Sequence, residues 1–236
     1  MINYLQSTIF GKALFAFPFF FFFLSTLVLA QSTEIGGGIG GFSYTGDLNR
    51  GYDILQSRPA VSVFHRTNLS DFVSFRVGAT AGKLVGSDAK GAVDVFGEQR
   101  SASFNIFLFE ASGVIEYHFL DWRTERSSVR WTPYVFGGVG IFAMSGHQNK
   151  PEEYSNVQPA LPFGLGFKYI LNPKWYIGIE GGARKTFFDY LDNVSDGNPS
   201  IKNYQYGNTN DTDLYYYLGF TINYSFYTIP CPFPYK

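Results

Sequence analysis

The stretch that decides the fold is residues 215–226, which read YYYLGFTINYSF. Apolar or aromatic side chains alternate with smaller or more polar ones, and a period of two places every second side chain on one face of a β-strand. One face carries Tyr216, Leu218, Phe220, Ile222, Tyr224 and Phe226. The other carries Tyr215, Tyr217, Gly219, Thr221, Asn223 and Ser225. The stretch therefore predicts a strand with one strongly apolar face.

The same period recurs along the chain after residue 30, and no sustained helical period interrupts it. It predicts eight strands, at 33–44, 58–66, 71–84, 103–119, 131–143, 160–171, 175–188 and 214–227. Several reach the roughly 9–11 residues that a tilted strand needs to cross a bilayer. In lipid every backbone N–H needs a partner, so a sheet crosses only when it is closed. We therefore expect an all-β protein, a closed antiparallel eight-stranded up-and-down outer-membrane β-barrel.

The connections between these strands alternate between longer and shorter ones. Bacterial outer-membrane barrels have short periplasmic turns and long external loops. We therefore expect a protein that is integral to the bacterial outer membrane, in contact with its lipid, with both termini in the periplasm. A soluble exported sandwich is the alternative, but it would expose the apolar faces to water as a large patch.

Aromatic side chains near the strand ends are expected to form two girdles at the level of the lipid headgroups. The periplasmic girdle would hold Phe119, Trp122, Trp131, Trp175, Phe226 and Tyr227. The external girdle would hold Phe187, Phe188, Tyr190, Tyr215 and Tyr216.

Residues 1–30 have the features of a secretory signal peptide. They contain one charged residue, Lys12, followed by an apolar run up to Ala30 and then polar residues. A basic start, an apolar middle and a small residue at the exit are typical of a cleaved signal, although an uncleaved anchor helix is the alternative. The expected organisation is a signal peptide at 1–30, the barrel at 31–227 and a short periplasmic tail at 228–236.

Composition excludes several classes of protein. The 236 residues include 18 Lys and Arg, 19 Asp and Glu, and a single cysteine, for a formal net charge of -1. This balance argues against nucleic-acid binding, and one cysteine excludes a disulfide framework. The three histidines, at positions 65, 118 and 147, lack metal-ligand spacing. We therefore expect no metal, no cofactor and no nucleic-acid partner, and no small-molecule substrate is indicated.

Residues 36–41, GGGIGG, match the spelling of a dinucleotide-binding fingerprint. That fingerprint must follow a strand and open a helix, whereas these glycines lie inside the first predicted strand. Glycine in such a strand instead allows curvature or makes room for large neighbours in the lumen.

Charged residues recur on the face that we expect to point into the barrel: Arg76, Glu110, Glu116, Lys168, Glu180 and Arg184. Charges in such a place must be paired or reach water. They could form a structural ion-pair plug, a relay or a narrow pore, and small barrels favour the plug because side chains fill their interiors. Lys185 is expected on the opposite face near the external end, where it could reach phosphate groups at the membrane surface.

Catalysis is the remaining possibility, because a Ser/His pair at a membrane surface could hydrolyse lipid. Ser145 and His147 are the only close candidates. A polar loop offers such a pair by chance, so we expect no catalytic residues and a non-enzymatic protein.

A family resemblance adds a role that the composition does not contain. Residues 162–169 (PFGLGFKY) lead into 175–195 (WYIGIEGGARKTFFDYLDNVS). This segment resembles the PorG-type outer-membrane β-barrel family of the Bacteroidetes. The most specific part of the resemblance is the stretch that contains Arg184, Lys185, Thr186, Phe187, Asp189, Tyr190, Leu191 and Asp192. Residues 46–49, residues 136–142 and the tail with Cys231-Pro232 are also similar.

The resemblance implies an accessory, anchoring component of type IX protein secretion and of the gliding machinery. Its implied partners are PorK/PorN-type periplasmic ring proteins, and it implies no catalytic residues. An alternative is a small transport or adhesion barrel, with the external loops 85–102 and 189–213 as its binding surface.

Overall fold

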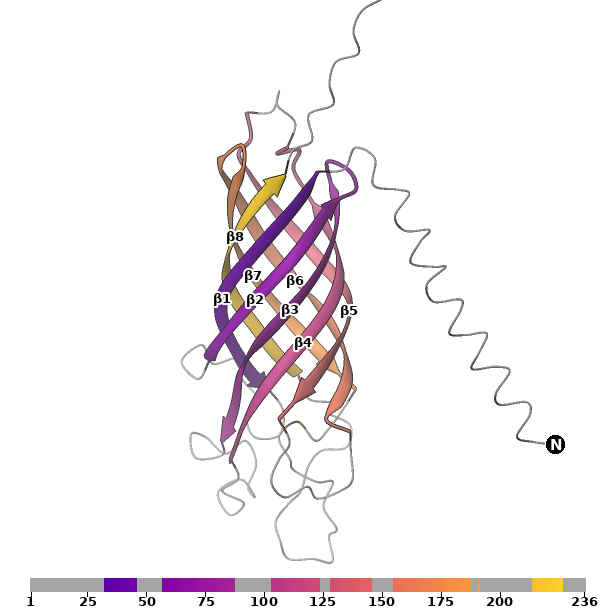
Figure 1. The fold of residues 1–236 in the computed structure, drawn as a ribbon, viewed down its shortest axis with the longest axis vertical. Helices are drawn as coiled ribbons and strands as arrows, with labels where there is room; N and C mark the ends of the chain where they lie inside the picture. The colour runs from indigo at the N-terminus through magenta and orange to yellow at the C-terminus, as the bar shows by residue number, and fades with distance from the viewer. Residues whose placement is uncertain are drawn as a thin grey trace, which may run out of the picture. The chain divides into compact units, whose positions relative to one another are not determined.

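The fold was obtained as a computed structural model, which describes residues 32–45, 57–87, 103–123, 128–145, 155–187, 191 and 214–226. Eight strands make up this part of the chain (Figure 1). They are β1 (Thr33–Thr45), β2 (Arg58–Asn68), β3 (Val73–Ser87), β4 (Ser103–His118), β5 (Trp131–Met144), β6 (Val157–Asn172), β7 (Trp175–Thr186) and β8 (Leu214–Phe226). All eight predicted strands are present, with ends shifted by up to three residues. The predicted signal peptide and C-terminal tail lie outside the described residues.

The strands close into one antiparallel barrel in chain order. Each strand pairs with the next, and β1 pairs with β8 over its whole length, from Thr33 opposite Phe226 to Thr45 opposite Leu214. No strand of the sheet is therefore left with an unpaired edge, which is what a lipid environment demands of a β-structure. The predicted closed up-and-down barrel is confirmed.

Side chains alternate between the two faces of the wall. All eight strands place large apolar residues outward, and the most exposed include Ile39 at 70%, Leu165 at 66% and Phe220 at 65% of their surface. Such an extensive apolar exterior is typical of a wall that faces lipid. We call this exterior the apolar belt. Within the described residues, no helix is long and apolar enough to span a membrane.

The glycine-rich segment of β1 serves the packing of the lumen. A Cβ atom on Gly36 would lie within 2.5 Å of both the Phe64 ring and Asn223 Oδ1, closer than real Cβ atoms approach other atoms. The absence of a side chain at Gly36 thus lets the neighbouring strands β2 and β8 project larger groups inward. The expectation that these glycines make room for lumen neighbours is confirmed at this position.

The two ends of the barrel differ. At the turn end, β2 joins β3 through residues 69–72 and β6 joins β7 through 173–174 (Figure 1). The second of these turns is fixed by Asn172 Oδ1, which accepts hydrogen bonds of 3.0 Å from the backbone N–H groups of Lys174 and Trp175. A short polar side chain that bonds to the backbone two residues ahead is a common turn device. We call the opposite end the loop end.

Two of the predicted girdle residues lie elsewhere. Trp122 is 2% exposed and Tyr215 is fully buried, because the first folds back over the lumen and the second lies at an inward position of β8. Other predicted girdle residues are exposed: Phe119, Trp131, Trp175, Phe187 and Phe226. Tyr216 is half-buried, whereas Phe188, Tyr190 and Tyr227 lie outside the described residues.

The apolar belt generates a first prediction. Replacing Phe220 with arginine should lower the free energy of unfolding by about 2–4 kcal/mol, because a charge would face lipid near the middle of β8. The measurement is denaturant unfolding of the protein in lipid vesicles. Leu69, 50% exposed in the β2–β3 turn, supplies the control, because Leu69→Arg should cost only roughly 0–1 kcal/mol at the interface. Equal losses in the two variants would contradict a lipid-facing belt.

Candidate functional site

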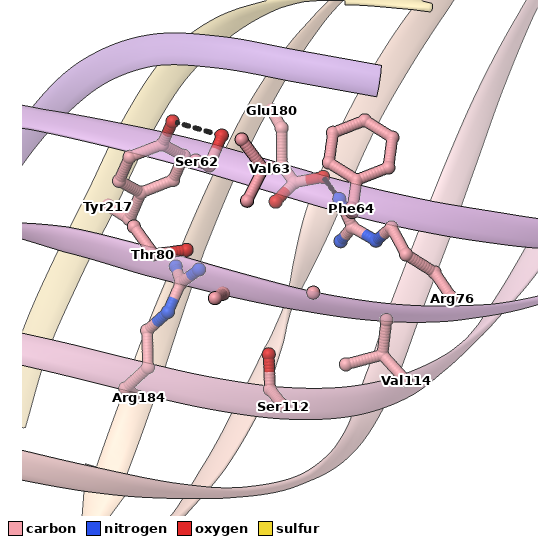
Figure 2. Close-up of a pocket in the computed structure, with 12 residues that line it drawn as sticks. Ser62, Val63, Phe64, Arg76, Thr80, Ser112, Val114, Glu180, Arg184 and Tyr217 are labelled. Carbon is pink, nitrogen blue, oxygen red and sulfur yellow. Dashed lines mark hydrogen bonds and ion pairs between the residues drawn. The ribbon is translucent and has the colours of Figure 1, made fainter. Parts of the chain in front are cut away.

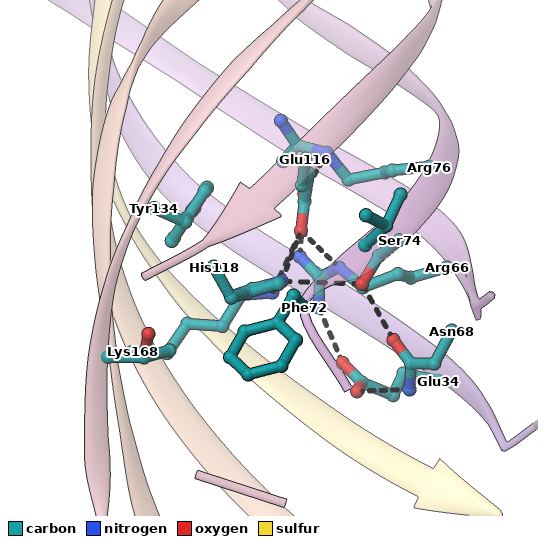
Figure 3. Close-up of polar contacts among 12 residues, drawn as sticks. Glu34, Arg66, Asn68, Phe72, Ser74, Arg76, Glu116, His118, Tyr134 and Lys168 are labelled. Atoms are coloured by element: carbon teal, nitrogen blue, oxygen red, sulfur yellow. Dashed lines mark hydrogen bonds and ion pairs between the residues drawn. The ribbon is translucent and has the colours of Figure 1, made fainter. Parts of the chain in front are cut away.

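The lumen near the turn end is organised around the carboxylate of Glu116 on β4, which is fully buried. Arg66 from β2 contacts both carboxylate oxygens: Nη2 donates a hydrogen bond of 3.1 Å to Oε1, and Nε lies 2.8 Å from Oε2. Arg76 Nε from β3 lies 2.9 Å from Oε1, and Lys168 Nζ from β6 donates to Oε2 at 2.8 Å (Figure 3). One carboxylate thus joins three cations that come from three other strands.

The network continues from Arg66 toward β1. Arg66 Nη1 lies 2.5 Å from Glu34 Oε2, and Asn68 Nδ2 donates to the other oxygen, Oε1, at 2.8 Å. Ser74 Oγ donates to Asn68 Oδ1 at 2.9 Å. Charge-assisted hydrogen bonds of this kind are the strongest polar contacts that side chains make, and Arg66 donates them to Glu34 on one side and to Glu116 on the other.

A second arm runs from Arg76 toward the middle of the barrel. Arg76 Nη1 donates to Glu180 Oε2 on β7 at 2.6 Å, and the Tyr134 hydroxyl on β5 donates to the same oxygen at 3.0 Å. Farther toward the loop end, Glu110 Oε2 accepts from Arg184 Nε at 3.3 Å and from the Tyr215 hydroxyl at 2.7 Å. Strands from all around the barrel therefore meet in polar contacts along its axis.

The lumen charges balance. Among the described residues, the buried charged side chains are four acids and four bases: Glu34, Glu110, Glu116, Glu180, Arg66, Arg76, Lys168 and Arg184. Burying each charge costs several kcal/mol, which is offset only by close partners with further hydrogen bonds. A buried pair adds little net stability, but removal of one partner is strongly destabilising. The network therefore adds little net stability, although the loss of any one member would be costly.

An aromatic cap lies over the network at the turn end. Trp122, in the connection after β4, packs edge-on against Tyr176 with ring centres 5.0 Å apart and contacts His118 at 5.7 Å. Arg123 lies 5.1 Å above the Trp122 ring and donates to the backbone oxygen of Ser70 at 2.8 Å. Burial lowers the pKa of the Arg123 guanidinium, and attraction to Glu34 opposes this effect. The cap ties the β4–β5 connection to the β2–β3 turn.

The loop end of the lumen is apolar instead. Buried residues from β1–β6 and β8 form one cluster there: Phe42, Tyr44, Ala60, Leu84, Phe104, Ile106, Leu108, Phe142, Met144, Ala160, Tyr215 and Tyr217, together with Leu191. Leu191 lies beyond β7 in the chain and is fully buried. Both ends of the lumen are thus packed, one with an aromatic cap over ion pairs and one with an apolar core.

Between these two regions the lumen holds a small cavity. Its lining includes Ser62, Arg76, Glu180, Arg184 and Tyr217 (Figure 2). Its volume is about 20 Å³, which is room for about one water molecule. A polar cavity of this size suits a water that bridges charged groups, and it is too small for a solute.

The six charged residues predicted to face the lumen are all buried there: Arg76, Glu110, Glu116, Lys168, Glu180 and Arg184. Sequence reasoning missed Glu34 and Arg66. Arg66 occurs two residues after Phe64, on the same face of β2, and its inward direction follows from that period. Both were overlooked because they lie near the ends of their predicted strands, where the pattern is shortest.

The residues of the family motif do not form one cluster. Arg184 and Thr186 are buried in the lumen, Lys185 and Phe187 are exposed on the outside, and Leu191 is buried at the loop end. Asp189, Tyr190 and Asp192 lie outside the described residues. The alternation of Arg184, Lys185 and Thr186 follows directly from the strand period.

The proposed catalytic pair is described only in part. Ser145 Oγ accepts a hydrogen bond of 2.8 Å from the backbone N–H of Phe107, while His147 lies outside the described residues.

A second serine and histidine are close in the lumen, with 3.3 Å between Ser74 Oγ and His118 Nε2. Glu116 approaches the same nitrogen at 3.5 Å, whereas a catalytic acid must bond to the other ring nitrogen. This group is therefore structural. No cluster of metal-binding side chains occurs among the described residues.

An apolar exterior around a lumen of paired charges is the arrangement of a transmembrane β-barrel. Residues 12–235 match the sequence model of a protein family that is described as "Domain of unknown function (DUF6089)". The chain belongs to this family. No curated protein matches its sequence significantly.

Several solved structures resemble the barrel. Neisserial surface protein A is 11% identical with a TM-score of 0.48, and the match covers 83% of this chain and 96% of that one. Ail, the attachment invasion locus protein of Yersinia pestis, is 10% identical with a TM-score of 0.46, over 84% of this chain and 100% of its own. The outer membrane protein OprG from Pseudomonas aeruginosa is 14% identical with a TM-score of 0.46, over 84% and 97% respectively.

The Glu116 network generates a second prediction. Glu116→Gln keeps the side-chain shape but leaves three cations without their shared carboxylate, so the free energy of unfolding should fall by about 3–5 kcal/mol. Glu110→Gln is the matched control. Glu110 has one cationic partner at 3.3 Å, whereas Glu116 has three, so the replacement of Glu110 should cost less. Denaturant unfolding in lipid vesicles measures both. A smaller loss for Glu116→Gln than for Glu110→Gln would show that Glu116 is not the centre of the network.

Proposed function

We propose that this protein is a non-enzymatic outer-membrane barrel that anchors a periplasmic assembly, as an accessory component of type IX secretion and gliding. The observation that carries the anchoring role is the packed lumen. In the part of the barrel that the structure describes, ion pairs, the aromatic cap and the apolar core occupy the interior, and the cavity between them, of about 20 Å³, is too small for a transported solute. A barrel without a passage acts through its surfaces.

The proposed orientation places the turn end and both termini in the periplasm. Two of the three connections at the turn end are short, 69–72 and 173–174, and this supports the orientation, since bacterial barrels keep their short turns in the periplasm. At the turn end, side chains tie two of the connections together. Arg123 bonds both to the β2–β3 turn, through Ser70, and to Ser74 of β3 at 2.8 Å. A rigid periplasmic face suits attachment to another protein.

The particular partners rest on the resemblance to the PorG-type family. That resemblance is most specific over residues 163–195, and it points to PorK/PorN-type ring proteins as the periplasmic contact. The family match over residues 12–235 is compatible with this role and does not distinguish it from others.

A third prediction tests the closed lumen. The purified protein, folded into planar lipid bilayers, should give no stable ion conductance, because ion pairs and packed side chains fill the lumen. The same sample must show the heat-dependent shift in gel mobility that marks a folded barrel. Steady conductance from folded protein would exclude a plugged anchor and favour a transport barrel.

A fourth prediction tests the secretion role. Deletion of the gene should retain type IX cargo inside the cell, and the tagged protein should recover ring components from solubilised outer membranes. Complementation with the wild-type gene is the control. Normal export by the deletion strain would remove the secretion role and leave the fold untouched.

The adhesion alternative is tested in the same strain. Variants that lack parts of the loops 85–102 or 189–213 should secrete normally if the turn end carries the function. Loss of surface binding with secretion intact would favour the adhesion barrel instead.

A further inference from the structure

The apolar belt is interrupted by a groove that runs over β6, β7 and β8. Its floor is the outward row of β7, where Gly181 and Ala183 are small. Its walls are the outward rows of the two neighbouring strands: Phe163 and Leu165 on β6, and Tyr216 and Leu218 on β8. The register pairs Leu165 and Leu218 with Gly181, and Phe163 and Tyr216 with Ala183. The groove has a volume of about 580 Å³.

The groove is closed on its inner side. A Cβ atom on Gly182 would lie 2.7 Å from the Phe136 ring, and one on Gly164 would lie 2.8 Å from it. The Phe136 ring therefore covers the inner surface of the wall behind the groove. The groove therefore opens on the lipid-facing surface, and the inward residues Phe136 and Tyr217 also contribute to its lining.

The groove ends in a positive charge. Lys185 occupies the next outward position of β7 after Ala183, roughly 6.6 Å farther along the strand, and it is exposed. Leu161 and Leu214 flank it on the neighbouring strands. A lysine at this position can rest its stem on apolar surface and hold its ammonium group at the level of the headgroups.

The dimensions favour one hydrocarbon chain over a protein segment. The walls on β6 and β8 are two strand spacings apart, roughly 10 Å between backbones, and their own side chains narrow this gap. An α-helix is itself about 10–12 Å wide with side chains, so it would not enter. An extended acyl chain is narrow enough to lie on Gly181 and Ala183.

We infer that this groove binds one acyl chain of an anionic membrane lipid whose phosphate group pairs with Lys185. The inference requires that the barrel lies in a membrane and does not depend on a role in secretion. The site joins an apolar groove to a cation at its loop end, which matches the two parts of such a lipid.

The test is native mass spectrometry of the folded protein in mild detergent. The probes are dimyristoyl phosphatidic acid and dimyristoyl phosphatidylcholine, added separately. The wild-type protein should retain one phosphatidic acid at collision energies that remove phosphatidylcholine. Gly181→Leu should reduce this retention roughly tenfold, because the leucine fills apolar volume that the chain would occupy. A Cβ atom at Gly181 would meet only Leu218, at 3.4 Å, so the variant should fold.

Matched controls exist for both parts of the site. Gly113 also faces outward, on β4, with only the Phe75 ring near its Cβ position, at 3.7 Å, and Gly113→Leu should leave retention unchanged. Lys185→Gln should lower retention of phosphatidic acid about threefold, whereas Lys83→Gln should not. Lys83 is likewise an exposed outward lysine, toward the loop end of β3.

Three outcomes would overturn the inference. The first is equal retention of the two lipids by the wild-type protein, and the second is an equal loss in Gly113→Leu and Gly181→Leu. The third is a cross-link from the Gly181→Cys variant to another protein in native membranes, which would assign the groove to a protein partner. A failure of outer-membrane fractionation would be a different result, because it would remove the membrane location itself.

Discussion

The structure depends on the hydrogen bonds between its first and last strands. β1 and β8 are separated by most of the chain, yet they pair from Thr33–Phe226 to Thr45–Leu214. Without this pairing, two rows of backbone N–H and C=O groups would face hydrocarbon, where each unsatisfied group costs several kcal/mol. With this pairing, every strand has a neighbour on each side. The alternation of side chains along each strand then decides which residues face lipid and which face the lumen. The apolar belt and the ion-paired interior are two consequences of one closure.

Closure also explains why so many charges can be buried. A closed wall brings Arg66, Arg76, Glu116 and Lys168 from four strands to within ion-pair distance around a single axis. In a flat sheet, residues on strands as far apart as β2 and β6 would not meet. The barrel therefore offsets the dehydration of its charges by geometry, and the aromatic cap and the apolar core limit the access of water from the two ends.

The sequence was sufficient for the strands and for the closed barrel, because a strict period of two persists over eight segments and a bilayer admits few alternatives. It also indicated the inward direction of Glu116 and Arg184. It was insufficient for Trp122, because a residue in a connection has no period and tryptophan is common at membrane interfaces. It did not identify Glu34 and Arg66 as partners, since pairing across the lumen depends on barrel geometry.

The Glu116 network has a consequence for the order of assembly. Arg66 and Arg76 arrive with the second and third strands, Lys168 with the sixth, and Glu180 with the seventh. A half-formed sheet that has entered the membrane would hold unmatched charges against hydrocarbon, which is a high-energy state. Glu34 and Glu116 on β1 and β4 already pair with Arg66 and Arg76, but the buried charges balance fully only when β6 and β7 add Lys168, Glu180 and Arg184. Electrostatics therefore favours insertion that is concerted with barrel closure, because a partly inserted sheet holds a charge imbalance against hydrocarbon.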